Sequence, residues 1–211
     1  MFAAHFAKRV IAFEPDPNAY SELTQNLALN PALANITVHQ KAISTEAGMV
    51  KLGVRDKAGD SSSSLLLAND DSWQVPSTTL ADVVAGGERP AFIKMDIEGH
   101  EFALFADICD VVARYKIPAL VAVHPHLFGV ARAMRIGRRT RLHKLAGSVA
   151  KRTIGRYEGF RAARSFAAEV KSNVVALTPA GQEIDLSKAA TRVLMGQNLT
   201  ESGSIIIQPR Q

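Results

Sequence analysis

Along the first 126 residues, short apolar runs alternate with longer segments in which apolar residues recur every three or four positions. The runs have the length of strands, and the longer segments have the period of helices. Strands are expected at 10–13, 36–42, 91–96 and 119–124. Helices are expected at 17–30, 79–84 and 100–115. Strands that alternate with helices in this way predict an α/β fold with a mostly parallel sheet.

Local residue choices support several of these boundaries. Asp16 is expected to cap the first helix, with Pro17 at its first position. Ser77 or Thr78 is expected to cap the second helix. Alternation with period two over 49–54 predicts a small edge strand or hairpin arm.

The last forty residues carry a different pattern. Strands are expected at 173–178 and 204–208, with a helix over 186–195 between them. Residues 205–207 are three consecutive isoleucines. A continuous apolar run of this kind is typical of a strand that is buried on both faces.

Acidic residues follow two of the apolar runs. Glu14 comes directly after the first run, and Asp96 and Glu98 come at the end of the third, just before a helix. The carboxyl ends of parallel strands are where ligands bind, so these three carboxylates are candidates for a functional site. The alternative is that they only cap helices and shape turns, with Gly99 relieving the backbone.

Two histidines end the fourth run. His124 and His126 flank Pro125, at the end of the strand that follows Asp96 and Glu98 along the chain. Each histidine could act as a base, because imidazole titrates near neutral pH. The alternative is a solvated turn beside the proline. The two acids and His124 could also ligate a divalent ion, but nothing in their spacing demands one, and no metal is assigned.

Composition is that of an ordinary globular protein. Of the 211 residues, 47% are hydrophobic and 21% are charged, which suits one domain over 1–211. Cys109 is the only cysteine, so no internal disulfide is possible. No apolar run has the length of a membrane span, and Lys8 and Arg9 follow the first apolar residues rather than precede them, unlike a secretory signal. A cytoplasmic location is expected.

One segment is strongly basic. Residues 127–170 hold eleven cations and two acids, so the segment carries a net charge of +9 and the rest of the +5 chain carries −4. Apolar residues at helical spacing predict basic amphipathic helices. These helices either cover the sheet as a solvated pair or form a lid or surface for an anionic partner, such as anionic lipid, a phosphate-bearing carrier or nucleic acid. Interleaved aromatic residues are few, so nucleic acid is not favoured.

Five short motifs also occur in a fixed order, at 12–17, 38–44, 61–67, 75–80 and 92–101. The first reads Ala-Phe-Glu-Pro-Asp-Pro and the last Phe-Ile-Lys-Met-Asp-Ile-Glu-Gly-His-Glu. In order and spacing, this set resembles the FkbM-like family of S-adenosylmethionine-dependent methyltransferases. The resemblance implies a Rossmann-like class I methyltransferase sheet with an antiparallel C-terminal hairpin. It also implies methyl transfer to a hydroxyl group of a sugar or secondary metabolite.

The resemblance gives individual residues a role. Glu14 is expected to bind the ribose of S-adenosylmethionine, with Asp16, Ala42 and Asp96 also at the cofactor. The catalytic residues are expected to be Asp96, Glu98 and His124, although the two acids could instead bind the methionyl amine. Many family members carry an acid two residues before the first histidine. Here that position is Ala122, so His124 lacks its usual acidic partner.

The chain departs from the family pattern at its start. Class I methyltransferases have an earlier strand and a Gly-rich turn whose amides approach the cofactor, and neither precedes Phe2. We therefore expect an N-terminally truncated chain, or a sheet that has re-paired around the gap. Such a chain is expected to bind S-adenosylmethionine very weakly or not at all. The alternative function is a non-catalytic remnant that acts as a binding module through 127–170.

Overall fold

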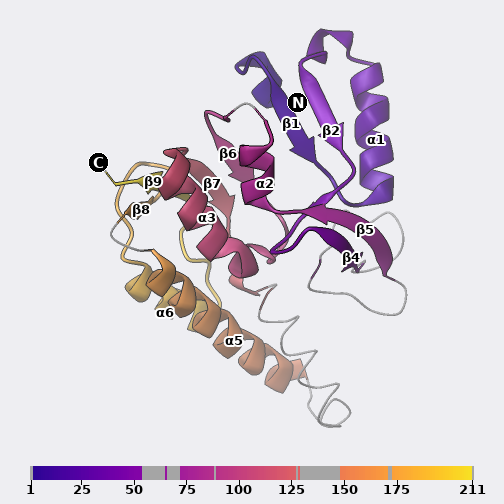
Figure 1. Ribbon diagram of the computed structural model, residues 1–211. Coiled ribbons are helices and arrows are strands. Elements are labelled where there is room, and N and C mark those ends of the chain that lie inside the picture. Colours follow the sequence, from indigo (N-terminus) through magenta and orange to yellow (C-terminus); the bar gives the residue numbers. More distant parts are fainter. Residues whose placement is uncertain are drawn as a thin grey trace. The chain divides into compact units, whose positions relative to one another are not determined.

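The chain forms two compact units, Met1–Thr79 and Leu80–Gln211. They are seen in a computed structural model (Figure 1), which describes residues 2–53, 65, 72–87, 89–126, 128, 148–170 and 173–210. Each unit has its own strands and helices, and each is described by itself.

The first unit opens with a short 3-10 helix, η1 (Phe2–His5), and a β-α-β element. Strand β1 (Val10–Phe13) pairs in parallel with β2 (Ile36–His39), and α1 (Pro17–Ala28) and the 3-10 helix η2 (Pro31–Leu33) connect them. The expected first strand and first helix are both confirmed. The Asp16 carboxylate caps α1 by accepting hydrogen bonds from the amides of Asn18 and Ala19, at 2.8 and 3.2 Å. A cap of this type stabilises a helix by about 1 kcal/mol.

A second, three-stranded sheet completes this unit. Its strands are β3 (Ala42–Ile43), β4 (Gly48–Leu52) and β5 (Trp73–Thr78), in the order β3-β5-β4. Strand β4 runs antiparallel to β5, which confirms the small strand expected at 49–54. The buried side chains of Ala42, Leu52 and Val75 form the core of this sheet.

The strand expected at 36–42 is in fact two strands. The backbone turns sharply after β2, where the amide of Lys41 donates to the carbonyl of His39 at 2.9 Å. The chain therefore leaves the β1-β2 sheet at His39 and pairs with β5 from Ala42 onward. Apolar periodicity could not show this break, because residues on both sides of the turn are strand-like.

The expected cap of the second helix is also wrong. Ser77 and Thr78 are the last two residues of β5, and α2 (Leu80–Ala85) begins after them. The Ser77 hydroxyl donates to the backbone carbonyl of Glu46 at 2.8 Å. Its side chain therefore ties β5 to the turn before β4.

The second unit is built on a four-stranded sheet in the order β6-β7-β9-β8. Its strands are β6 (Ile93–Met95), β7 (Ala119–Ala122), β8 (Val174–Leu177) and β9 (Ser204–Pro209). β6 and β7 are parallel, whereas β9 is antiparallel to both β7 and β8. The antiparallel C-terminal pair at one edge is thus confirmed. Over the described residues of both units, parallel and antiparallel ladders are equally numerous, so the sheet content is mixed rather than mostly parallel.

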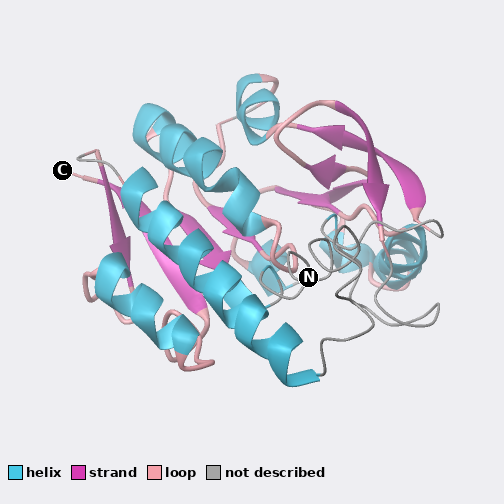
Figure 2. Ribbon diagram, turned by 90° about the horizontal axis from the view of Figure 1, so that it is seen from below, coloured by secondary structure: helices cyan, strands magenta, loops and turns pink. Residues whose placement is uncertain are grey.

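Three further helices pack in this unit. α3 (Glu101–Tyr115) buries Leu104, Phe105 and Ile108. α5 (Ser148–Glu169) and α6 (Leu186–Leu194) lie side by side (Figures 1 and 2). The ring of Phe105 stacks on that of Phe166 from α5, with centroids 3.4 Å apart. The helices expected at 100–115 and 186–195 are therefore confirmed, with ends that differ by one residue.

The three isoleucines of β9 alternate in burial. Ile205 and Ile207 are fully buried, whereas Ile206 is half-buried. The apolar run predicted a strand that is buried on both faces. β9 is instead more buried on one face than on the other. Its antiparallel neighbours leave one face of the sheet more open, which is common for antiparallel strands.

Among the described residues, strands β1 and β6 each lie at an edge of their sheet. Within the described residues, β1 pairs with β2 alone and β6 with β7 alone.

None of the helices in the described ranges combines the length and the apolar composition needed to cross a membrane. Of the basic segment, α5 is described and is helical. The apolar residues that predicted helices there, at 127–134 and 142–149, lie almost entirely outside the described ranges, so that prediction is not tested.

Candidate active site

Asp96 and Glu98 follow β6 in a turn with a strained backbone. Glu98 has a φ of 54° and Gly99 a φ of 95°. Glycine adopts positive φ freely, but the same conformation costs about 1–2 kcal/mol for a residue with a side chain. Strain of this kind gathers at binding and catalytic sites. The strained turn therefore makes this end of the sheet a candidate for a functional site.

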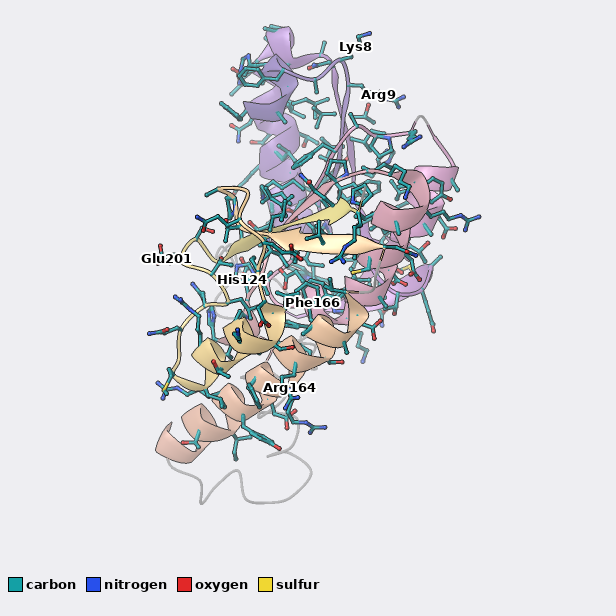
Figure 3. The ribbon with its side chains drawn as sticks, turned by 90° about the vertical axis from the view of Figure 1, so that its left-hand side faces the viewer. Lys8, Arg9, His124, Arg164, Phe166 and Glu201 are labelled. Atoms are coloured by element: carbon teal, nitrogen blue, oxygen red, sulfur yellow. The ribbon has the colours of Figure 1, made fainter. Side chains whose placement is uncertain are left out.

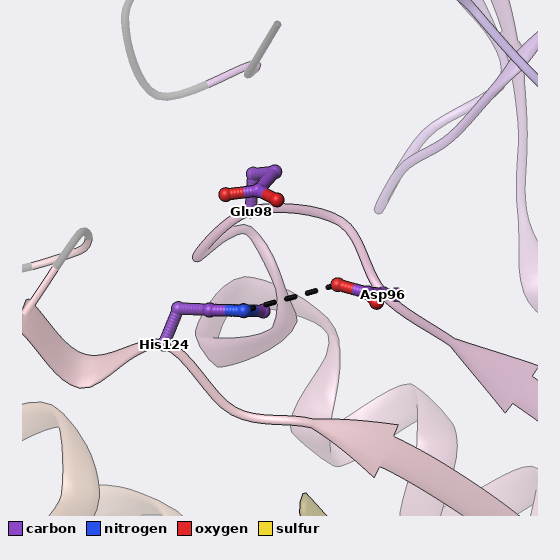
Figure 4. Close-up of side chains that lie close together, drawn as sticks. All are labelled: Asp96, Glu98 and His124. Atoms are coloured by element: carbon purple, nitrogen blue, oxygen red, sulfur yellow. Dashed lines mark ion pairs between the residues drawn. The ribbon is translucent and has the colours of Figure 1, made fainter. Parts of the chain in front are cut away.

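The structure brings Asp96, Glu98 and His124 together (Figure 4). One polar atom from each side chain lies within 4.8 Å of the others. His124 follows β7, the parallel neighbour of β6, so both strands deliver these side chains to the same end of the sheet. The His124 Nε2 atom lies 3.8 Å from Asp96 Oδ1, which is too long for a direct hydrogen bond.

A fourth residue, Glu101, was not expected at the site. It is the first residue of α3 and is fully buried. Its Oε1 atom lies 3.1 Å from His124 Nδ1 and accepts a hydrogen bond from the Ile97 amide at 3.0 Å. The acidic partner that Ala122 cannot supply therefore comes from a different element. The one sequence feature that pointed to a buried Glu101 is that this acid lies on the same face of its helix as apolar core residues.

These contacts raise the pKa of the His124 imidazole. The hydrogen bond to Glu101 raises the pKa of His124, burial lowers it, and the charges of Glu101, Glu98 and Asp96 raise it further. Since Glu101 Oε1 is an acceptor, Nδ1 is the donor, and in the neutral ring the lone pair lies on Nε2. His124 thus presents a proton acceptor on the side of Asp96.

His126 does not join the cluster. Its side chain is exposed, and its ring centroid lies 6.3 Å from that of His124. Pro125 between them is buried, and a Cβ atom added to Gly159 of α5 would lie 2.6 Å from its carbonyl oxygen. α5 thus packs closely on the segment that carries His124.

The spread of the cluster would also permit a shared divalent ion. Carboxylate oxygens and an imidazole nitrogen are suitable ligands. However, Asp96 already has a cationic neighbour, since Lys94 Nζ lies 3.3 Å from its Oδ2. We assign no metal to these residues.

Glu14 lies in the first unit, directly after β1. Its Oε1 atom accepts a hydrogen bond from the Asp16 amide at 2.8 Å, and its own amide donates to the His39 carbonyl at 3.0 Å. Burial raises the pKa of the Glu14 carboxyl, the Asp16 amide lowers it, and the Asp16 charge raises it. The result is a half-buried carboxylate fixed at the carboxyl end of a strand.

The two other residues expected at the cofactor have structural roles. The Asp16 carboxylate is buried and caps α1. The Ala42 side chain is 2% exposed, within the core of the three-stranded sheet. A cofactor contact by Ala42 would therefore have to use its backbone.

Comparisons with known proteins place these observations in a family. The family model described as the methyltransferase FkbM domain matches residues 2–131. Among solved structures, the chain is similar to methyltransferase FkbM from Methylobacillus flagellatus KT, with 19% identity and a TM-score of 0.37. The match covers 55% of this chain and 26% of that one, so this chain spans about a quarter of that protein's length. No curated protein sequence matches.

Proposed function

The chain belongs to the FkbM methyltransferase domain family, and we propose that it transfers a methyl group from S-adenosylmethionine to a hydroxyl group. The acceptor would be a sugar or a secondary metabolite. The observation that carries this proposal is the pairing of His124 with the buried Glu101, beside the carboxylates of Asp96 and Glu98. An alcohol must lose its proton to accept a methyl group, and this arrangement supplies a base.

The residues have distinct parts in the proposed reaction. When bound, S-adenosylmethionine supplies an electrophilic methyl group on sulfur. The acceptor oxygen would take this methyl group as the sulfur is released as a neutral thioether, and His124 Nε2 would take the hydroxyl proton. The imidazolium that results is favoured by the negative charges of Asp96, Glu98 and Glu101.

The cofactor residues are argued from the same chemistry. Glu14 offers a half-buried carboxylate at the end of β1, which suits the two hydroxyls of a ribose. Asp96 is partly exposed, with 43% of its side-chain surface open, and offers a carboxylate to the cationic methionyl amine. The family membership and these carboxylates support S-adenosylmethionine as the cofactor.

Methyl transfer with the His124→Gln variant tests the proposal. The assay follows labelled methyl from S-adenosylmethionine into a panel of sugar and metabolite hydroxyls, using the full-length protein. Loss of a general base should lower kcat by about 10²- to 10⁴-fold, with the affinity for S-adenosylmethionine unchanged. His126→Gln, at the exposed histidine, is the matched control and should keep its rate. Equal rates for wild type and His124→Gln would refute the proposal.

A second candidate function is a binding module for an anionic lipid surface. It is favoured by the charges of α5, where Arg161 and Arg164 are exposed while Glu158 is buried. Phe166 lies on the inner side of the helix and Arg164 on the outer side (Figure 3). Arg161 Nη1 lies 3.5 Å from Glu158 Oε1, so Glu158 offsets part of this positive charge, and Arg164 adds to it on the outer side of α5.

A further inference from the structure

Glu101 is an unusual place for a carboxylate. Its side chain is 0% exposed at the start of α3, where water cannot solvate its charge. A buried carboxylate is unfavourable unless charged or hydrogen-bonding partners compensate for the lost water. In the described part of the chain, its partners are the Ile97 amide and His124 Nδ1, and its Oε2 atom has none.

A purely structural role does not require the charge. The Ile97 amide would be satisfied equally well by the amide oxygen of a glutamine. The start of α3 favours an acid there, but by only about 0.3–1 kcal/mol for an exposed site. The one contact that uses both the negative charge and the acceptor is the contact with His124.

We propose that Glu101 is the positioning residue of this site, fixing the tautomer and orientation of the His124 imidazole. Glu101 also holds the Ile97 amide, so one carboxylate connects the turn of Asp96 and Glu98 to the end of β7. Its importance for methyl transfer rests on the proposed function, whereas its hold on His124 does not. Glu101 itself does not touch the reacting atoms in this mechanism.

Several other groups face His124, and their effects on its pKa must be distinguished from the effect of Glu101. Asp96 and Glu98 approach from the turn after β6, and His126 lies on the same segment as His124. α5 approaches this segment through Gly159. Among these groups, Glu101 alone combines a short contact to Nδ1 with full burial. Removal of its charge should therefore change His124 more than removal of the Glu98 charge.

Nuclear magnetic resonance of the histidine ring nitrogens tests this directly, without cofactor or acceptor. In wild type, the neutral His124 ring should carry its proton on Nδ1. In Glu101→Gln, the pKa of His124 should fall, because the largest cause of its raised value is removed. Glu98→Gln is the matched control, with the same change of charge and a smaller expected fall. An unchanged His124 pKa and tautomer in Glu101→Gln would overturn the proposal.

Two further measurements keep the proposal testable. If Glu101→Gln does not fold, a neutral His124 ring protonated on Nε2 in wild type would by itself contradict the proposal. In the kinetic assay, Glu101→Gln should lower kcat by about 10- to 100-fold, the range known for groups that orient a metal-bound imidazole, with KM for S-adenosylmethionine unchanged. If the His124 pKa shifts but no form of the protein transfers methyl groups, the positioning role stands and the proposed function fails.

Discussion

In the proposed reaction Glu14 binds the cofactor and His124 acts as the base, and single substitutions test these two roles separately. Glu14→Gln keeps the size of the side chain but removes the charge that two ribose hydroxyls would use. Loss of such a two-point contact should cost about 2–3 kcal/mol, or roughly 30- to 140-fold in affinity for S-adenosylmethionine. Titration calorimetry of S-adenosylmethionine into wild type and Glu14→Gln measures this change.

The matched control is Glu22→Gln. Glu22 is exposed on α1, so the same chemical change there should leave the affinity unaltered. If Glu14→Gln and Glu22→Gln bind S-adenosylmethionine equally well, Glu14 does not hold the cofactor.

His124 should also make stability depend on pH. Its folded-state pKa is raised above the ordinary value of 6.5, so the folded protein binds this proton more tightly than the unfolded chain does. The resulting stabilisation is fully present below about pH 6.5 and is lost as pH rises through the raised pKa. Urea unfolding of wild type and His124→Gln across this range should show a difference in unfolding free energy that shrinks with rising pH. A difference that stays constant with pH would contradict this contribution.

The sequence predicted which three side chains the structure brings together in the candidate site. Asp96, Glu98 and His124 were expected because each ends or follows an apolar run, and the ends of parallel neighbours meet. Glu101 was missed because its role depends on how α3 starts beside β7, which no local pattern specifies. The sequence motif contained Glu101, but nothing in the motif separates a buried partner from an exposed helix acid.

At the scale of elements, α5 is packed closely enough to leave no room for a methyl group at Gly159. A Cβ atom there would meet the backbone of Pro125, which cannot move as a flexible side chain can. The added methyl group should cost about 1–3 kcal/mol through overpacking, and helix propensity should return about 1 kcal/mol, so Gly159→Ala should destabilise the protein by up to about 2 kcal/mol. Thermal or urea unfolding measures the sum.

Ala168→Gly is the companion variant. This residue is exposed on the same helix, so the change should cost about 1 kcal/mol from helix propensity alone. A Gly159→Ala protein that is more stable than wild type would show that α5 does not press on the His124 segment.

The outer side of α5 gives a second test at this scale, for the proposed anionic lipid surface. Arg161→Gln with Arg164→Gln should reduce binding to anionic vesicles, and binding by wild type should fall steeply with salt, because exposed charges are screened within about 8 Å at physiological ionic strength. Lys188→Gln, on the exposed side of α6, is the control.

Co-sedimentation with anionic and neutral vesicles, alone and with a phosphate-rich competitor, measures binding. If wild type does not bind anionic vesicles at low salt, α5 serves only to pack against α3 and α6. Loss of vesicle binding to the competitor would point to a phosphate-bearing carrier instead.

Elements were predictable where their periodicity was long. The helices α3 and α6 and the strands β8 and β9 were all expected, because each has a clear apolar pattern. Strand β5 was not, since Pro76 lies inside it and a proline argues against a strand. The division of 36–42 into β2 and β3 was also missed, because a two-residue turn leaves no trace in periodicity.

At the scale of the molecule, strand pairing was less predictable than strand position. The antiparallel C-terminal pair followed from the family resemblance, whereas the equal share of parallel and antiparallel ladders did not. Pairing depends on contacts between residues far apart in the chain, so a local pattern constrains it weakly. The family can be recognised from the ordered motifs, because these consist of residues at the ends of strands and do not depend on how the strands pair.

The pH dependence of a single turnover tests the central claim most directly. The full-length protein is mixed with saturating S-adenosylmethionine and hydroxyl acceptor, with a chelator present, and the rate of methyl transfer is measured across pH. Since His124 must be neutral to accept the proton, the rate should rise with pH through a midpoint above 6.5 and then level off. In His124→Gln, the rate should be low and should lose this dependence. A rate that is independent of pH in wild type, or an identical profile in His124→Gln, would contradict the account.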